Sequence, residues 1–458
     1  MPHGAARMFV NRPSRSATRV LALALAVAAV SPASLYSPAS AADSETNVVS
    51  RGVEIPEFYN PPADLPGADG ELVRTEPLPL GAGLSIPGVG SLPGTATRVM
   101  YKTTDNNGGA AAVTGAYIEP FADWQGEGDR PLVVVAPGTM GQGDQCSASL
   151  GLEHPIFFNG KTVSVGYEDI GVYRLLARGV AVMVTDYVGL GATDRLHTYV
   201  DRVDEGHAVL DAARAAVNLP DASVTGSSRV GLFGYSQGGG ATGSASELHG
   251  TYAPDVNLVG AYVGAPPADL RATAKGIDGS GLAGALGWTI NGLAQSNPEM
   301  RPILEENLNE AGHEALEDLS TACVADAIFS YPFQRSSNWT TTGESLDEII
   351  EREPAVQAII SEQKLGRMTP QVPVRVATGT EDDIVPHEQA RQLAVDWCGQ
   401  DAEVTYKAVV LPNLGDGLIT NHIAPLLVDQ TAAVDWLTGL VGGGDPAASN
   451  CATMPNQR

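Results

Sequence analysis

The chain has 458 residues, of which 43% are of the types AVILMFWYC and 17% are charged, with 52 glycines and 31 prolines. This composition supports a large core with many loops and excludes a disordered chain or a coiled coil. The 27 basic and 53 acidic residues give a net charge of −26, which argues against nucleic acid as a partner and against electrostatic binding to anionic membranes, because both need a basic face. An acidic, well-solvated surface is typical of a soluble exported protein.

The N-terminal residues have the features of a secretory signal peptide. Arginines precede an apolar run from Val20 to Val30, and the small-residue sequence Ala39-Ser40-Ala41 follows. The run is shorter than the about 20 residues that cross a bilayer as a helix, and no later segment is apolar for that length. We therefore expect a secreted protein, cleaved after Ala41, with no integral membrane segment.

Four cysteines are spread along the chain: Cys146, Cys323, Cys398 and Cys451. In an exported protein they predict two disulfides, although four cysteines allow three pairings. Their spacing is too scattered for a zinc site, in which ligands usually occur in closely spaced pairs. None lies in a recognisable context for a catalytic thiol.

Residues 42 to 90 are rich in Pro, Gly and Asp and show no sustained period, which predicts an extended arm packed on the domain or a partly ordered leader. The pattern then changes. Ala96–Thr104 and Ala112–Ile118 flank the turn-forming sequence Asp105–Gly109, and together they predict a β-hairpin.

A series of short apolar segments follows the hairpin and alternates with helical patterns, notably Glu205–Val217 and Glu388–Cys398. Strands that are apolar on both faces are typical of a sheet covered by helices on both sides. The alternation predicts an α/β fold with a mostly parallel central sheet and right-handed crossovers. The expected strands are Leu132–Ala136, Ala181–Thr185, Val230–Gly234, Leu258–Val263, Val372–Ala377 and Val404–Leu411.

The strands are interrupted for about a hundred residues between Arg271 and Met368, where only helical patterns occur. A helical insertion between two strands of such a sheet predicts a cap. Three glycines within an apolar stretch of this insertion suggest either a mobile flap or a static helix packed on the core: Gly281, Gly284 and Gly287. We divide the chain into a signal peptide 1–41, an N-terminal arm 42–90, a first core part 91–270, a cap 271–369, a second core part 370–441 and a tail 442–458.

Gly234-Tyr235-Ser236-Gln237-Gly238 is the central motif for chemistry, because it follows a predicted strand and precedes the small-residue start of a helix. A serine in such a sharp turn needs minimal side chains two positions before and after it. The helix N-terminus behind it offers free N–H groups to developing negative charge. The pattern predicts that Ser236 is a nucleophile.

A serine hydroxyl needs a histidine to accept its proton, and the imidazole needs a carboxylate to orient it. In nucleophile-elbow enzymes the chain order is Ser, acid, His. His422, after the last strand and a loop and at the start of a final helix 423–440, is the expected base. His387, which lies close behind the acid in the same loop, is expected to be a solvated loop residue.

The acid is expected at Asp382, directly after the strand 372–377, where ligand sites of parallel sheets collect. Asp383 is the weaker alternative and is more typical of a capping or solvated residue, and Asp416 is typical of a turn. The oxyanion needs two backbone N–H donors. One is expected from Gln237, and the other from Gly138 or Thr139, since Pro137 has no N–H; a Thr139 hydroxyl could add a third bond.

Together these motifs resemble the secretory lipase family, the lipase A type of α/β-hydrolase. The similar segments run in the family's order over roughly residues 90 to 440: Ala136–Thr139 with Asp144–Cys146 after it, Asp186–Gly191, Gly206–Ala216, Gly234–Gly238, Gly379–Pro386 and Asn421-His422. The sequence departs from many relatives at Pro137 and at Ser147–Ser149, which bears on oxyanion geometry and substrate choice.

The resemblance implies an α/β-hydrolase fold with a helical cap, a Ser236–Asp382–His422 triad, and secreted lipase or carboxylesterase activity on triacylglycerols or related acyl esters, with no cofactor and no metal. It also suggests a Cys146–Cys323 disulfide, which leaves Cys398–Cys451. A lipid or other acyl ester is the expected partner, with transient contact to a lipid interface. An acyltransferase that uses the same acyl-enzyme is an alternative, as is a non-catalytic binding protein of this fold, and the sequence does not choose between lipase and esterase.

Overall fold

The computed structural model describes residues 48–65, 67–86, 90–446 and 448–454. The expected signal peptide 1–41 lies outside these residues, as do the beginning of the expected arm and the last four residues of the expected tail.

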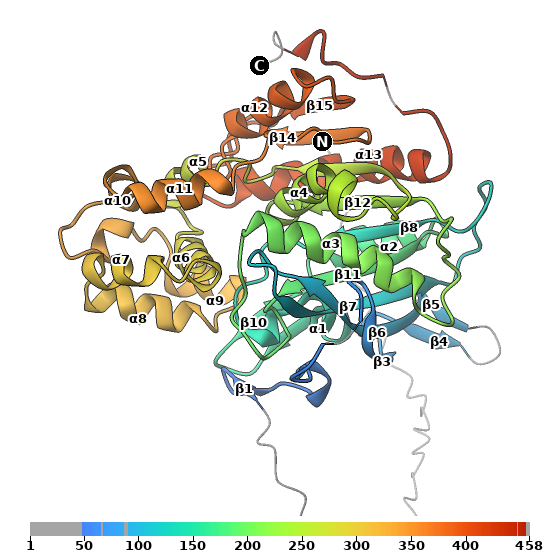
Figure 1. The fold of residues 1–458 in the computed structure, drawn as a ribbon, viewed down its shortest axis with the longest axis horizontal. Coiled ribbons are helices and arrows are strands. Elements are labelled where there is room, and N and C mark those ends of the chain that lie inside the picture. Colours follow the sequence, from blue (N-terminus) through green and yellow to red (C-terminus); the bar gives the residue numbers. More distant parts are fainter. Residues whose placement is uncertain (1–47, 66, 87–89, 447, 455–458) are drawn as a thin grey trace, which may run out of the picture. The chain divides into compact units, whose positions relative to one another are not determined.

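A nine-stranded sheet forms the centre of the fold (Figure 1). In chain order its strands are β3 (Leu72–Leu78), β6 (Gly94–Thr104), β7 (Ala110–Pro120), β8 (Leu132–Ala136), β11 (Ala181–Val188), β12 (Val230–Tyr235), β13 (Leu258–Gly264), β14 (Val374–Gly379) and β15 (Val404–Val409). Their order across the sheet is β15-β14-β13-β12-β8-β11-β7-β6-β3. The pairs from β15 to β11 are parallel and the remaining three pairs are antiparallel.

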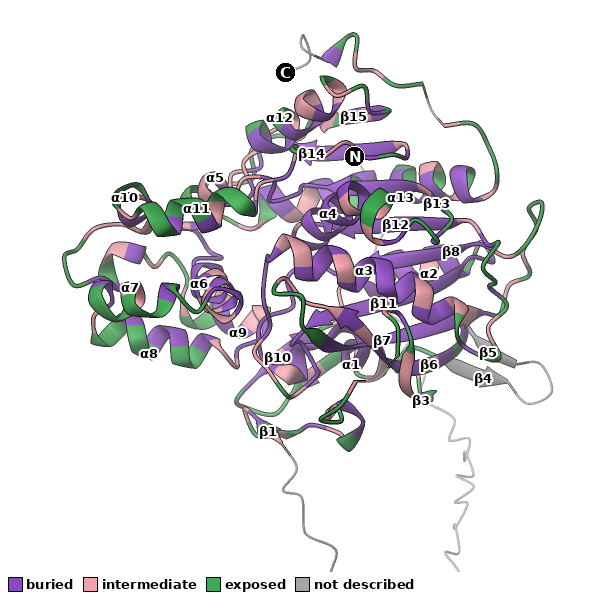
Figure 2. Cartoon of the chain, viewed as in Figure 1, coloured by how far each residue is buried: buried purple, intermediate pink, exposed green. Residues whose placement is uncertain are grey.

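Helices cover both faces of this sheet, which confirms the predicted α/β class. On β8, Leu132 and Val134 face one apolar cluster, whereas Val133 and Val135 face the other. Figure 2 shows the central strands as buried. Because both faces are covered, every residue of this strand is apolar. The first cluster includes α3 (Arg202–Val217), α4 (Gln237–Tyr252) and α12 (His387–Cys398), and the second includes α1 (Ala148–Glu153), α2 (Asp169–Leu176) and α13 (Thr420–Val441).

The antiparallel end of the sheet begins with the predicted hairpin, β6 and β7, which pair from Gly94 opposite Pro120 to Thr104 opposite Ala110. Part of the segment expected to be an arm joins it, because β3 pairs with β6 as the edge strand. Pro77 lies inside β3, and proline is tolerated in an edge strand, where one side of the backbone needs no partner. Short hairpins lie outside this sheet: β1 (Val49–Ser50) with β2 (Val53–Glu54), β4 (Leu84–Ile86) with β5 (Gly90–Leu92), and β9 (Ile156–Phe158) with β10 (Val163–Val165).

The insertion between β13 and β14 is helical, as its pattern predicts, and has its own apolar cluster that includes Trp288, Leu319 and Trp339. Gly284 and Gly287 are close-contact points in this cluster, because a Cβ on them would lie 2.8 Å from Ala327 and 2.4 Å from Leu319. These two glycines therefore allow close packing between helices of the insertion, as expected for a static helix and not for a mobile flap. The helices are α5 (Leu270–Ile277), α6 (Ala285–Ser296), α7 (Met300–Asn307), α8 (Glu310–Leu319), α9 (Val324–Ser330), α10 (Leu346–Arg352) and α11 (Pro354–Glu362).

Two disulfides tie distant segments together, in the pairing that the family resemblance implies. Cys146, after β8, is bonded to Cys323 at the start of α9, and Cys398, at the end of α12, is bonded to Cys451. The first disulfide joins the loop beyond β8 to the helical insertion. None of the helices in the described part of the chain has the length and apolar character of a membrane span.

Four carboxyl groups that are buried or half-buried form no ion pair within the described part of the chain. Burial raises the pKa of Glu168 and Asp169, at the start of α2, to about 7. It also raises the pKa of Asp144 to about 7 and that of Glu205, in α3, to about 8. The low-polarity surroundings penalise the charged form of each of these groups.

We expect the Cys146–Cys323 disulfide to stabilise the fold more than Cys398–Cys451. The residues that they join are 177 and 53 positions apart, for which the chain-entropy estimate gives about 5 and about 4 kcal/mol. Urea unfolding of the double variants Cys146→Ala/Cys323→Ala and Cys398→Ala/Cys451→Ala should show the larger loss in the first. A larger loss in the second would contradict this account.

The buried carboxyl groups predict that thermal stability falls as pH rises from 6.5 to about 8. Their folded pKa values lie above those of the unfolded chain, so the stability they confer is complete below about pH 4 and is lost as pH rises through the folded pKa values. The melting temperature of the protein across this range is the measurement. Glu205→Gln, which cannot ionise, should show a shallower fall, and a melting temperature that rises with pH in the unsubstituted protein would contradict the explanation.

Candidate active site

Ser236 lies in the turn between β12 and α4, with backbone angles of φ 59° and ψ −124°. A positive φ is strained for a residue with a Cβ, and the surroundings enforce it. A Cβ on Gly234 would lie 2.1 Å from the Gly238 carbonyl oxygen, and a Cβ on Gly238 would lie 1.9 Å from that of Ala136. Both glycines are therefore required for strand and helix to approach closely enough to make this turn.

The structure brings together the three residues that the sequence predicts as a triad. Ser236 Oγ lies 2.8 Å from His422 Nε2, and His422 Nδ1 lies 2.7 Å from Asp382 Oδ2. An ionised carboxylate only accepts hydrogen bonds, so Nδ1 carries the proton and Nε2 is free to accept one from the Ser236 hydroxyl. Asp382 and His422 are buried, and Ser236 is partly exposed.

Asp382 is held by the backbone that follows it. Its Oδ1 accepts hydrogen bonds from the N–H groups of Ile384 and Val385, which leaves Oδ2 for His422. Asp383 instead accepts the N–H of Gly417. Asp416 is exposed and accepts a hydrogen bond from the side chain of Asn413. Of the three candidate acids, Asp382 is the one in contact with His422.

The surroundings of the two candidate histidines differ from those that the sequence predicts. His422 lies inside the first turn of α13, which begins at Thr420 rather than after the histidine. The helix starts early because the Asn421 side chain bonds the Leu414 N–H and the Gly415 carbonyl of the preceding loop. The expectation that His387 is a solvated loop residue is wrong. It is buried at the start of α12, and its ring nitrogens lie 3.1 Å from the Gly379 carbonyl and 3.1 Å from the Tyr406 hydroxyl.

Of the two candidate oxyanion donors in the loop after β8, Thr139 has the unbonded backbone N–H among the described residues. The Gly138 N–H donates to Glu168 Oε1 at 2.7 Å, so Gly138 is already bonded. Among the described residues, the N–H groups of Thr139 and Gln237 have no hydrogen-bond partner. The Thr139 hydroxyl, the possible third donor, shares a hydrogen bond of 2.7 Å with the Tyr199 hydroxyl, in which either group can donate.

The side chain of Gln237 is fixed by a buried network. Its Nε2 lies 2.8 Å from Glu205 Oε1 and 3.0 Å from His197 Nε2. His197 Nδ1 donates to the Val188 carbonyl, so Nε2 accepts from Gln237, and burial lowers the pKa of His197 to about 4. The neutral imidazole and Glu205 thus anchor the residue that follows the nucleophile.

The cavity at Ser236 is small and mostly apolar, with a volume of about 30 Å³. Such a space holds roughly one water molecule. Its walls come from both sides: Thr139, Tyr199, Val200, Gln237 and Pro267 of the core, Leu270, Thr273, Ala274, Ile277, Leu282 and Thr289 of the insertion, and Ile384 and Val385 beside Asp382. The helical insertion therefore covers the nucleophile.

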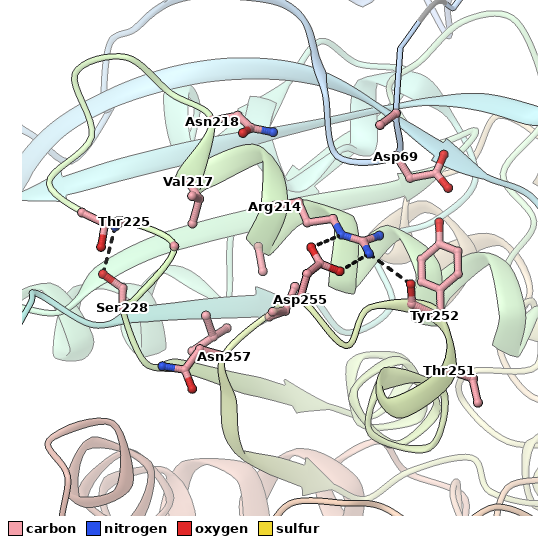
Figure 3. Close-up of a pocket in the computed structure, with 15 residues that line it drawn as sticks. Asp69, Arg214, Val217, Asn218, Thr225, Ser228, Thr251, Tyr252, Asp255 and Asn257 are labelled. Atoms are coloured by element: carbon pink, nitrogen blue, oxygen red, sulfur yellow. Dashed lines mark hydrogen bonds and ion pairs between the residues drawn. The ribbon is translucent and has the colours of Figure 1, made fainter.

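A larger groove of about 560 Å³, drawn in Figure 3, lies at the end of β12 that is farther from Ser236. Val230, which begins β12, lines it, whereas Ser236 follows the end of the same strand. The groove's cation, Arg214, is paired with Asp255 and also bonds the Tyr252 carbonyl, and Ser228 accepts the Thr225 N–H. These groups bond one another, and the groove contains no counterpart of the Ser236 arrangement.

Sequence reasoning missed the side chains that hold the loop after β8: Tyr167, Glu168, Tyr187 and Tyr199. Tyr187 lies in Asp186–Gly191, one of the segments that resemble the family, and this resemblance was the one sequence feature that pointed to it. Tyr167 and Glu168 lie in a segment of low regularity, where no periodic pattern pointed to them.

Comparisons with known proteins identify the family and the fold. The family model described as "Secretory lipase" matches residues 153–449. The chain is 28% identical to "Probable inactive lipase MT1628" of Mycobacterium tuberculosis, over 84% of this chain and 82% of that protein. It is 27% identical to "Secreted triacylglycerol lipase LIP1" of Malassezia furfur, over 79% of this chain and 71% of that protein.

Solved structures share the fold. Candida antarctica lipase A in its closed state superposes with a TM-score of 0.67 at 20% identity, covering 87% of this chain and 90% of that one. The rice cell wall degrading esterase LipA from Xanthomonas oryzae superposes with a TM-score of 0.66 at 18% identity, covering 83% of this chain and all of that one. The overall fold is thus that of a lipase A-type α/β-hydrolase. Because the family model matches more than half of the chain, the chain belongs to the secretory lipase family.

Proposed function

We propose that the protein is a secreted serine ester hydrolase that cleaves acyl esters, triacylglycerols or related lipids among them. The observation that carries the proposal is the continuous hydrogen-bonded chain from Ser236 through His422 to Asp382. Membership of the secretory lipase family and the likeness to relatives named as secreted triacylglycerol lipases support the substrate class and export.

In the proposed reaction Ser236 Oγ attacks the acyl carbonyl carbon while His422 Nε2 accepts its proton. Asp382 holds the imidazole in the tautomer with the proton on Nδ1 and stabilises the imidazolium that forms. The tetrahedral intermediate then collapses, His422 gives the proton to the leaving alcohol, and Ser236 keeps the acyl group. A water molecule then attacks the acyl carbon while His422 Nε2 accepts its proton. The bond from the acyl carbon to Ser236 Oγ breaks, His422 returns the proton to Oγ, and the carboxylic acid leaves.

The oxyanion of the tetrahedral intermediate needs two donors, and the unbonded N–H groups of Thr139 and Gln237 are suited to the role. Gln237 is the first residue of α4, so the helix dipole adds to its effect. Gly138, the alternative to Thr139, is a poorer candidate because its N–H is bonded to Glu168.

An acyl chain needs more room than the cavity over Ser236 offers, so substrate entry requires the insertion to shift. Because α6 packs tightly against α8 and α9, we propose that the insertion moves as a unit rather than through α6 alone. The mostly apolar walls favour a hydrocarbon chain over a polar acyl group.

Exposed apolar side chains near this cavity support transient contact with a lipid surface. Phe333, Leu414 and Leu418 are 55%, 45% and 40% exposed. Their segments are tied to the loop before the cavity residue Leu282 by two backbone hydrogen bonds, from Gly281 to the Gly417 carbonyl and from Phe333 to the Ser280 carbonyl. Since the chain is strongly acidic, a neutral or zwitterionic lipid surface suits it better than an anionic one.

The test is hydrolysis of p-nitrophenyl esters from short to long acyl chains by the purified protein and by Ser236→Ala. We expect the variant to lose turnover by about three orders of magnitude or more, because the acyl-enzyme cannot form. The chain-length maximum of the unsubstituted protein, measured below and above substrate solubility, separates an esterase from an interfacial lipase.

The outcome matters because one relative is named as an inactive lipase. Near-normal activity in Ser236→Ala would remove Ser236 from the mechanism. No hydrolysis of any ester by the folded protein would favour acyl transfer or a binding role instead. Ser228→Ala, which changes a serine in the distant groove, is the matched control and should keep its activity.

A further inference from the structure

The loop Pro137–Thr139 is fixed by four buried or partly buried side chains that the triad does not use. Tyr187 donates its hydroxyl to the Pro137 carbonyl at 2.7 Å, and Glu168 accepts the Gly138 N–H at 2.7 Å. Tyr167 donates to the Thr139 carbonyl at 2.9 Å. Tyr199 bonds the Thr139 hydroxyl.

These bonds fix the peptide planes on both sides of one unbonded N–H. The peptide between Pro137 and Gly138 is held at its carbonyl by Tyr187 and at its N–H by Glu168. Tyr167 holds the carbonyl of Thr139 on the far side. Because a peptide unit is planar and rigid, the peptide between them, which carries the free Thr139 N–H, has little freedom to rotate.

We propose that Glu168 and Tyr187 are positioning residues that aim the Thr139 N–H at the oxyanion and keep the Gly138 N–H out of it. The inference rests on the proposed ester hydrolysis and identifies which groups orient its second oxyanion donor.

Both residues are held in energetically costly positions. Tyr187 has a positive φ of 71°, a strained conformation for a non-glycine residue, and its hydroxyl is buried against the loop. Glu168 is 5% exposed, and no basic side chain in the described part of the chain forms an ion pair with it. Its burial raises the pKa to about 7, which disfavours a negative charge next to the oxyanion loop.

The test compares Glu168→Leu, which removes the acceptor, with Glu168→Gln, which keeps an Oε1 acceptor in the same place. Loss of alignment at one oxyanion donor predicts a fall of about 100-fold in kcat for p-nitrophenyl butyrate, with KM changed less than about 3-fold. Glu168→Gln should remain within about 5-fold of the unsubstituted protein. Inhibition by a trifluoromethyl ketone, which forms an oxyanion adduct, should weaken in parallel with kcat.

Tyr187→Phe tests the same inference by removing only one oxygen atom, so the test remains available even if Glu168→Leu does not fold. We expect a fall in kcat of about 10-fold or more, again at nearly constant KM. Tyr173→Phe is the matched control, because the buried Tyr173 hydroxyl in α2 has no hydrogen-bond partner among the described residues. Its kcat should be unchanged.

An unchanged kcat in Glu168→Leu or in Tyr187→Phe would overturn the inference. A higher kcat in either variant would also overturn it; in Glu168→Leu it would mean that the released Gly138 N–H is the better oxyanion donor. The inference would also be overturned if KM rose along with the fall in kcat in these variants while the affinity for the trifluoromethyl ketone was retained. These outcomes leave Ser236→Ala inactive, so they are distinguishable from failure of the proposed function, in which the unsubstituted protein itself would not hydrolyse the ester.

Discussion

The close approach of β12 and α4 around Ser236 sets the geometry of the other groups in the site. The serine can hold its positive φ only because Gly234 and Gly238 leave no side chains in the space between strand and helix. The same turn places the Gln237 N–H at a helix N-terminus and brings Ser236 Oγ within 2.8 Å of His422. A methyl group at either glycine would collide with a backbone carbonyl and push the helix away from the sheet.

The polar groups around this turn are buried and form hydrogen bonds with one another. Glu205 and His197 hold the side chain of Gln237, and Glu168 and the tyrosines hold the loop after β8. Such networks restrict the donors to one geometry, which is what preorganised stabilisation of an oxyanion requires. The disulfide from Cys146 to Cys323 links the end of this loop to the insertion above it.

The sequence was sufficient for the parts of the fold that follow local rules. Apolar strands alternating with helices predicted the sheet, and the chain order Ser, acid, His identified the three residues that meet at 2.7 and 2.8 Å. It was not sufficient for β3, since a proline-containing edge strand resembles a loop, or for the buried state of His387. The network around Thr139 depends on contacts between residues about 30 to 60 positions apart, and no local pattern encodes these.

The most direct measurement of the central claim is covalent labelling of Ser236 with a p-nitrophenyl alkylphosphonate, followed by mass spectrometry of the intact chain and its peptides. We expect one adduct per chain on the peptide that contains Ser236, with one equivalent of p-nitrophenol released, and little labelling in His422→Ala. This expectation is contradicted if the folded protein forms no adduct at Ser236, or if His422→Ala is labelled as fast, since Ser236 would then not be activated by the histidine beside it.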